Sequence, residues 1–352
     1  MSGLTTRQRI ILAVIVLFTV LAGIARYADW KPLLAFALAT VALAGLAYVV
    51  SFSTEQVGER FGPAVTGVLQ STLGNLPEFF IVIFALSAGE LVVARASILG
   101  SIFANALLVL GLVIVAGCQA SSDGVMRFQT RLPKDNAILM LLASFLIVVI
   151  GISAATNDKA SHHITGISIV GAVALLLTYG VWLVDYLRED APREAGDAQP
   201  RVSLTLALVL LTAAGVASAF VSDWFVTALS PAMEKIGVSK AFAGLVVVGI
   251  AGNAVENTTG IVLALKGEAD LAISVVKNSV AQITAFLFPA LVLVSLLFTT
   301  HLTFALAPVY IGALLLTAIA LWQITSDGEA TRFEGVALIA FYVIVAVLAW
   351  YE

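Results

Sequence analysis

The feature that most constrains this chain of 352 residues is a succession of apolar stretches about as long as a bilayer is thick. A hydrocarbon core of about 30 Å needs roughly 20 apolar residues in a helix. Within that core, the backbone polar groups are satisfied only in helices or closed barrels. We therefore predict an all-α polytopic membrane protein with eleven spanning helices: Arg9–Arg26, Pro32–Ser51, Gly62–Ala88, Leu91–Gly117, Ala137–Ala155, Ile164–Leu187, Val202–Val221, Ala241–Leu265, Leu271–Thr299, Leu302–Thr325 and Gly335–Tyr351.

The composition supports this class and excludes others. Hydrophobic residues make up 61% of the chain and charged residues 11%, whereas soluble domains have about 45–50% and about 25%. With 18 Lys+Arg against 22 Asp+Glu, the net charge of −4 offers no basic surface for nucleic acid. The single cysteine, Cys118, has no partner for an internal disulfide, and no Cys/His cluster has the spacing of a zinc site. We expect no cofactor.

The distribution of Lys and Arg predicts the orientation of these helices. If the N-terminus is inside, the inner loops hold 11 basic residues and the outer loops hold 6, as the positive-inside rule requires. We therefore expect a cytoplasmic N-terminus in the cell (plasma or inner) membrane. The shorter mixed stretch Trp224–Ile236 is predicted to be an interfacial helix.

Two similar halves divide the chain in this prediction. The charged stretch 188–201, which contains Pro192 and Pro200, is expected to be a solvated cytoplasmic linker. It follows an N-terminal membrane helix (1–30) and a first repeat of five helices (31–187), and it precedes a second repeat of five helices (202–352).

A short polar motif recurs at the same place in each half. The sequence GNLPE (Gly74–Glu78) and the sequence GNAVE (Gly252–Glu256) are 178 residues apart, each in the middle of a predicted span. The two copies lie in the third and the eighth predicted spans, and this odd offset of five places them in opposite orientations across the membrane. Inverted repeats with interrupted helices that meet near the midplane are typical of secondary transporters.

The carboxylates of these motifs are the strongest functional candidates. A charged residue at mid-span costs about 2.5–3.5 kcal/mol and is a functional hypothesis by default. The structural alternative is a neutral carboxyl held by an interhelical hydrogen bond, but recurrence of Glu78 as Glu256 favours function. Asn75 and Asn253 lie three residues before each glutamate, on the same helical face. Such amide and carboxylate oxygens suit Ca²⁺ or Na⁺.

The helix that follows each motif carries a polar stripe with the spacing i, i+4, i+8. The first stripe is Ser97, Ser101 and Asn105, and the second is Ser274, Asn278 and Gln282. Polar stripes in membrane helices also serve as interhelical hydrogen-bonding surfaces, so both interpretations stay open.

These motifs resemble the calcium/cation antiporter superfamily, and within it the Ca²⁺/H⁺ exchanger branch. The resemblance rests on GNLPE with LGSIFANALLVLG (99–111), and on GNAVEN with NSVAQITAFLFP (278–289), and it extends over nearly the whole chain. It implies two essential glutamates and conserved polar positions on the following helices. The expected metal-binding residues are then Glu78, Glu256, Asn75, Asn253, Ser101, Asn105, Ser279 and Gln282.

The chain departs from the family pattern at several positions. Asn257 stands where the family often has histidine, Arg95 where it usually has glutamine, and Lys277 with Asn278 where it has an apolar residue and glycine. Arg95 is about 120° from the polar stripe and near a helix end, which favours extension of its side chain to the interface. Lys277 either extends to the inner interface or pairs with a site glutamate and modulates which cation binds.

The function we expect is antiport of Ca²⁺ against H⁺ by alternating access, with Ca²⁺ as transported substrate. Two unpaired carboxylates in a low-dielectric site cannot both stay charged, so one Ca²⁺ or about two protons restores neutrality. The alternatives are a Na⁺ or K⁺/H⁺ antiporter, made plausible by Lys277, and a cation channel. An intramembrane hydrolase is disfavoured because neither motif supplies a nucleophile–base pair, so we do not expect an enzyme.

Overall fold

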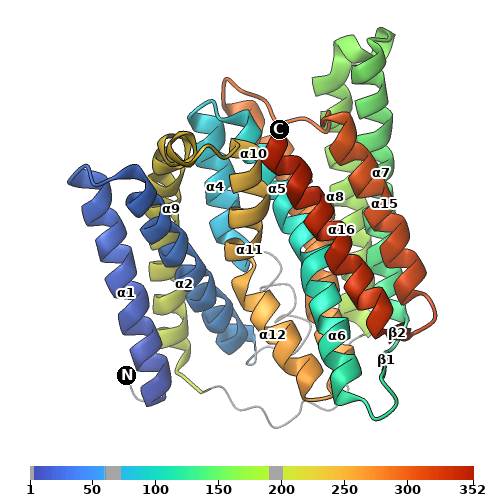
Figure 1. Ribbon diagram of the computed structural model, residues 1–352, viewed down its shortest axis with the longest axis horizontal. Coiled ribbons are helices and arrows are strands. Elements are labelled where there is room, and N and C mark those ends of the chain that lie inside the picture. The colour runs from blue at the N-terminus through green and yellow to red at the C-terminus, as the bar shows by residue number, and fades with distance from the viewer. Residues whose placement is uncertain (1–3, 59, 61–72, 190–200) are drawn as a thin grey trace.

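The computed structural model describes residues 4–58, 60, 73–189 and 201–352, and for 131–134, 136, 186–189, 255 and 256 it describes the backbone alone. Helices make up almost all of this part of the chain (Figure 1). The elements are α1 (Thr6–Tyr27), α2 (Pro32–Gly58), α4 (Leu76–Ser87), α5 (Leu91–Phe103), η1 (Ala104–Val109), α6 (Leu110–Ala120), β1 (Val125–Arg127), α7 (Arg131–Thr156), η2 (Lys159–His163), α8 (Ile164–Glu189), α9 (Leu204–Ile236), α10 (Lys240–Phe242), η3 (Ala243–Val248), α11 (Gly249–Gly252), α12 (Ala254–Leu265), α13 (Ala269–Gln282), η4 (Ile283–Leu287), α14 (Phe288–Val294), η5 (Ser295–Leu297), α15 (Pro308–Thr325), β2 (Glu329–Thr331) and α16 (Arg332–Tyr351).

The helices confirm a polytopic all-α membrane protein. Among the described residues, nine helices are long and apolar enough to cross a membrane. The pair Lys240–Gly252 and Asn257–Leu265, which is bent by 54°, adds a tenth when it is taken as one span. The predicted span Gly62–Ala88 is described only from residue 73, where α4 forms a helix of 12 residues. Most of the predicted linker 188–201 also lies outside the described residues.

Two predicted boundaries are wrong. The stretch Trp224–Ile236 is not a separate interfacial helix, because α9 continues without a break for 33 residues. Phe225 and Leu229 are buried at helical spacing, and Phe225 packs against Phe36 of α2 with ring centroids 4.9 Å apart. This tertiary contact supplies the apolar environment that the mixed sequence does not indicate.

The tenth predicted span begins later than expected. Its helix, α15, starts at Pro308 rather than at Leu302. Proline suits the first turn of a helix because its missing N–H would have no partner there. Leu302 lies between η5 and α15, and its N–H donates to the Ser295 hydroxyl at 2.9 Å rather than to a carbonyl within a helix. The preceding residues therefore form a connection at the helix end.

A small antiparallel ribbon, which the sequence did not predict, joins two connections at one end of the molecule (lower right in Figure 1). β1 pairs with β2 so that Met126 faces Ala330. Arg127 bridges Asp123 at 2.6 Å and Glu329 at 3.1 Å, on the exposed side of the ribbon. The ribbon ties the end of α6 to the turn between α15 and α16.

The local structure around the two motifs recurs at the spacing of the sequence repeat. Both α4 and α12 contain 12 residues, and they begin directly after Asn75 and Asn253. Each helix is followed by a glycine in the left-handed region, Gly89 at φ 75° and Gly267 at φ 81°. In Figure 1, α4 lies in the upper half of the molecule and α12 in the lower half. The two broken regions thus extend toward opposite ends.

Backbone contact between α5 and the segment η3–α11 forms the centre of the packing. A Cβ placed on Gly100 would overlap the backbone of Leu245, and one placed on Gly249 would overlap the backbone of Gly100. Membrane helices that pack this closely use small residues at the crossing. The contact brings the helix that carries Asn105 against the helix that precedes Asn253.

An ion pair between Lys240 and Glu90 lies at one end of the contact between α5 and η3–α11. Glu90 lies in the turn between α4 and α5, and its carboxylate accepts hydrogen bonds from Lys240 at 2.7 and 3.0 Å. The hydroxyl of Ser230, in α9, donates to the same carboxylate at 2.9 Å. Glu268, at the equivalent position after α12, is exposed. The pair connects α9 and α10 to the start of α5.

The Gly100 contact predicts a large effect of a single methyl group. We expect Gly100→Ala to destabilise the protein by about 1–3 kcal/mol, because the added Cβ forces the two backbones apart. Thermal unfolding in detergent measures the effect. Gly312→Ala is the matched control, since its Cβ meets no atom within 4 Å. A melting temperature of Gly100→Ala equal to that of the control would contradict the packing described above.

The Glu90 ion pair predicts a pH-dependent contribution to stability. Burial raises the pKa of the Glu90 carboxyl, but the hydrogen bonds from Lys240 and Ser230 and the Lys240 charge lower it more, so this pKa lies below 4.5. The stabilisation is therefore present above about pH 4.5 and is lost as the pH falls through the folded-state pKa. Because both side chains are partly exposed, we expect no more than about 1 kcal/mol.

Unfolding of Glu90→Gln, compared with the unmodified protein from about pH 7 to about pH 3, measures this contribution. The difference in stability is expected to narrow toward low pH. Glu268→Gln serves as control because Glu268 is exposed at the equivalent position. A difference that stays constant over the whole range would show that the charge of Glu90 does not stabilise the fold.

Candidate cation-binding site

Asn105 lies at the centre of the candidate site. It is in the π-helical turn η1 and is completely buried. Its amide nitrogen is within hydrogen-bond distance of Asn253 Oδ1 at 2.7 Å, Ser279 Oγ at 3.1 Å and the Ser101 carbonyl at 3.1 Å. Single π-helical turns inside membrane helices occur frequently at functional sites. One side chain therefore connects three helices that carry predicted site residues.

The break between α11 and α12 positions Asn253. The side-chain amide of Asn253 donates to the Gly249 carbonyl at 2.9 Å, a turn earlier in the chain. This bond orients the other atom of the amide, Oδ1, toward Asn105. Asn253 precedes the first residue of α12 and is completely buried. The break thus presents a side-chain oxygen inside the protein.

Glu78 lies against the same break. It is in the first turn of α4 and is 3% exposed. A Cβ added to Gly252 would overlap the Glu78 carboxyl oxygen and lie 2.9 Å from its Cδ. Only glycine at position 252 leaves room for this carboxylate beside Asn253. The N-terminus of a helix also stabilises a negative charge, which suits a carboxylate in the first turn of α4.

The structure places the other predicted residues in different ways. Asn75 is buried directly before α4. The backbone of Glu256 is in the first turn of α12, as Glu78 is in α4, but its side chain lies outside those described. Gln282 is partly exposed at the end of α13, and none of the described contacts links it to Asn105. The roles of Glu256 and Gln282 stay predictions.

Several buried oxygens face the protein interior around Asn105. The hydroxyls of Ser97 and Ser101 and the side-chain oxygen of Asn105 have no hydrogen-bond partner among the described residues. Hard cations such as Ca²⁺ take six to eight oxygen ligands from carboxylates, amides and hydroxyls. In the part of the chain that is described, no three or more His, Cys, Asp or Glu side chains lie close enough together to hold a metal ion. This donor set suits an alkali or alkaline-earth cation better than a transition metal.

The side chains of Arg95 and Lys277, which depart from the family pattern, extend away from Asn105. Arg95 donates to the Thr303 hydroxyl at 3.2 Å, in the connection before α15, which agrees with extension to a helix end. Lys277 is 1% exposed and donates to the Thr325 hydroxyl of α15 at 3.0 Å. Lys277 is about 200° around α13 from Ser279. None of the described contacts joins its ammonium to Glu78.

Sequence reasoning missed the two glycines that shape the site. Gly249 supplies the carbonyl that orients Asn253, and Gly252 makes room for Glu78. The motif shows Gly252 next to the asparagine, but the sequence pattern does not indicate that this glycine makes room for Glu78. A signal was present in the recurrence of the glycine as Gly74 in the first copy.

Gly252→Ala tests whether the Glu78 carboxyl binds a cation where the structure places it. The added Cβ displaces this carboxyl, and we expect cation affinity to fall at least about tenfold, or 1.4 kcal/mol. Titration calorimetry with Ca²⁺ and with Na⁺ measures the affinity. Gly215→Ala is the control, because its Cβ makes an ordinary contact with Leu76 at 3.6 Å. Equal affinities of the two variants would show that the Glu78 carboxyl does not bind the cation at this position.

Comparison with known proteins places this chain in a family. The profile of the family described as "Sodium/calcium exchanger protein" matches residues 31–185 and 206–351, which is most of the chain. A Ca(2+)/H(+) antiporter of Aphanothece halophytica is 28% identical over 96% of this chain and 95% of its own length. The Ca(2+)/H(+) antiporter ChaA of Bacillus subtilis is 29% identical over 90% of this chain and 92% of its own length.

Solved structures have the same fold. The structure of native YfkE superposes with a TM-score of 0.81 at 26% identity, over 97% of this chain and 100% of that one. The H+/Ca2+ exchanger CAX superposes with a TM-score of 0.75 at 16% identity, over 97% of this chain and 89% of that one. With the family profile matched in both halves, this chain belongs to the sodium/calcium exchanger protein family.

Proposed function

We propose that this protein is a secondary active antiporter that exchanges Ca²⁺ for H⁺ across the membrane by alternating access. The observation that carries the proposal is the hydrogen bond between Asn105 and Asn253, which joins the two halves of the chain at buried oxygens beside Glu78. Family membership and relatives that are named Ca²⁺/H⁺ antiporters over nearly their whole length support the same function.

The proposed coupling rests on competition for the same oxygens. In this proposal Glu78 and Glu256 share the site, and in a low-dielectric environment two neighbouring carboxylates hold both negative charges only when a cation neutralises them. One Ca²⁺ or about two protons neutralises them, so either load crosses the membrane while the empty, doubly charged site does not. Movement of one group of helices against another would then expose the site to each side in turn.

Lys277 is the residue that bears on the identity of the transported cation. An ammonium beside the glutamates would reduce the net negative charge and favour a monovalent cation such as Na⁺ or K⁺. The hydrogen bond from Lys277 to Thr325 directs the ammonium to α15 instead. This contact supports binding of a divalent cation at Glu78, because it engages the ammonium elsewhere.

We further propose an N-terminus on the cytoplasmic side of the cell membrane, and no enzymatic activity. The excess of basic residues in the loops on the side of the N-terminus supports this orientation. The oxygen-rich cluster around Asn105 supports a carrier of cations, because it presents amides and hydroxyls rather than a nucleophile with an adjacent base.

The decisive experiment measures coupled transport in proteoliposomes. With an imposed pH gradient, the unmodified protein is expected to take up Ca²⁺ and to release protons when Ca²⁺ is added. We expect Glu78→Gln and Glu256→Gln each to reduce both signals to the level of empty vesicles, because an amide neither carries the charge nor exchanges the proton. Near-normal transport by either variant would contradict the site.

Two controls sharpen this experiment. Glu268→Gln removes an exposed carboxylate in the turn after α12 and is expected to transport normally. Proton release driven by Ca²⁺, Na⁺ and K⁺, compared between the unmodified protein and Lys277→Leu, measures selectivity. Greater release with Na⁺ or K⁺ than with Ca²⁺ in the unmodified protein would replace the Ca²⁺ assignment by a monovalent one.

A further inference from the structure

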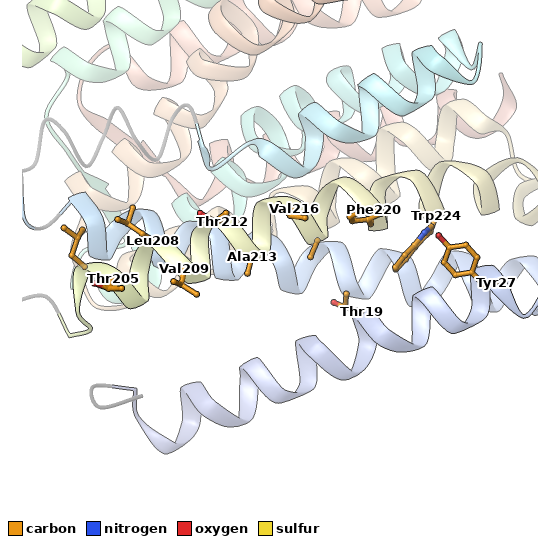
Figure 2. Close-up of a pocket in the computed structure, with 12 residues that line it drawn as sticks. Thr19, Tyr27, Thr205, Leu208, Val209, Thr212, Ala213, Val216, Phe220 and Trp224 are labelled. Carbon is orange, nitrogen blue, oxygen red and sulfur yellow. The ribbon is translucent and has the colours of Figure 1, made fainter.

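A long groove separates α1 from α9 on the surface of the membrane-spanning region. It has a volume of about 1020 Å³, and ten of its twelve lining residues come from α9. Figure 2 shows the side chains of α9 from Thr205 to Trp224 along the groove, with Thr19 and Tyr27 of α1 on the other side. None of these residues belongs to the candidate cation site.

Packed side chains close the groove at both ends. At one end, the rings of Tyr27 and Trp224 meet edge to face with centroids 6.0 Å apart. The Trp224 ring also lies directly over Gly23, with its Cη2 atom 2.9 Å from where a Cβ would be. At the other end, Leu4 packs with Val202 in a small apolar cluster. The groove is therefore built into the fold.

Between these ends the groove is apolar and open to the side. Val209 is 57% exposed and Phe220 is 58% exposed, within a helix that crosses the membrane. The stretch from Leu204 to Trp224 is about 30 Å long at 1.5 Å per residue, which is the thickness of the hydrocarbon core. Lipid acyl chains therefore surround the open side of the groove.

Basic residues gather at the end of the groove where the N-terminus lies. Arg7, in the first turn of α1, and Arg201, just before α9, are exposed. Arg60 donates to the Val202 carbonyl at 2.8 Å and so lies at the same end. Glu55, near the end of α2, is the adjoining acidic residue. A basic residue near the membrane surface attracts anionic lipid.

The helix that forms one wall of this groove lies outside the family match. The matched residues are 31–185 and 206–351, so α1 precedes both segments. It packs along α2, which in turn packs along α9 (left in Figure 1). One wall of the groove is therefore formed by a helix that precedes the two matched segments.

We propose that this groove binds an anionic phospholipid of the leaflet on the N-terminal side. Its acyl chains lie along α9 between α1 and the bilayer, and its phosphate group contacts Arg7 and Arg201. The apolar lining accounts for the chains, and the arginines account for the charge of the headgroup. The bound lipid occupies the half of the groove that lies in the leaflet on the N-terminal side.

Native mass spectrometry of the detergent-purified chain, with phosphatidylglycerol or phosphatidylcholine added, tests the proposal. We expect the unmodified protein to bind phosphatidylglycerol at least tenfold more tightly than phosphatidylcholine. Ala213→Trp fills the groove from α9 and is expected to lose both lipids. Ala174→Trp, on an exposed face of α8 outside the groove, is the matched control and is expected to retain them.

The headgroup contact is tested separately. The double variant Arg7→Gln with Arg201→Gln is expected to bind both lipids equally, whereas Lys159→Gln with Lys235→Gln, which removes the same charge elsewhere, keeps the preference. The two arginine substitutions leave the apolar lining of the groove unchanged, so they also test the proposal if Ala213→Trp does not fold.

Two outcomes would overturn the proposal. One is equal binding of the two lipids by the unmodified protein, or binding by Ala213→Trp at the level of the Ala174→Trp control. The other is a dimer of the unmodified protein that Ala213→Trp dissociates without loss of lipid, which would make the groove a contact between two copies. The measurements need no Ca²⁺, so their result is independent of the transport function.

Discussion

Every interruption of a helix inside the membrane has to be satisfied by another part of the protein, and this constraint organises the structure. An unpaired backbone group in a hydrocarbon environment costs several kcal/mol. The helix that ends at Gly252 restarts after Asn253, and the side chain of Asn253 returns to the carbonyl of Gly249. Asn105 then contacts the remaining oxygen of Asn253. The same side chains that close the break therefore line the candidate cation site.

Close packing of backbones is the condition for these contacts. Asparagine and serine side chains are short, so Asn105 reaches Asn253 and Ser279 only because the helices approach closely. Gly100 allows that approach, since a Cβ there would overlap a neighbouring backbone. Gly252 does the same for the carboxylate of Glu78. The glycines and the polar residues of the two motifs thus act together, which explains why they occur together in the sequence.

Much of the fold could be predicted from the sequence because hydropathy is a local property. The apolar stretches predicted most of the spans, and the 178-residue spacing predicted the match between α4 and α12. The prediction was wrong for Trp224–Ile236, where contact of Phe225 with Phe36 decides that α9 continues. The β1–β2 ribbon was missed because it joins two loops about 200 residues apart, each too short to show a strand pattern.

The sequence by itself determined that this is a membrane protein, because the length and polarity of a segment decide whether it crosses a bilayer. The recurring motif predicted two related halves. The sequence also indicated Glu78, Asn105 and Asn253 as candidates, since polar residues at mid-span need a reason to be there. Only the tertiary structure decided which polar side chains form hydrogen bonds with one another, and that Lys277 donates to Thr325. The partners of Asn105 are 148 and 174 residues away in the chain. The rotation of each helix and its distance from its neighbours, which no local pattern encodes, bring them together.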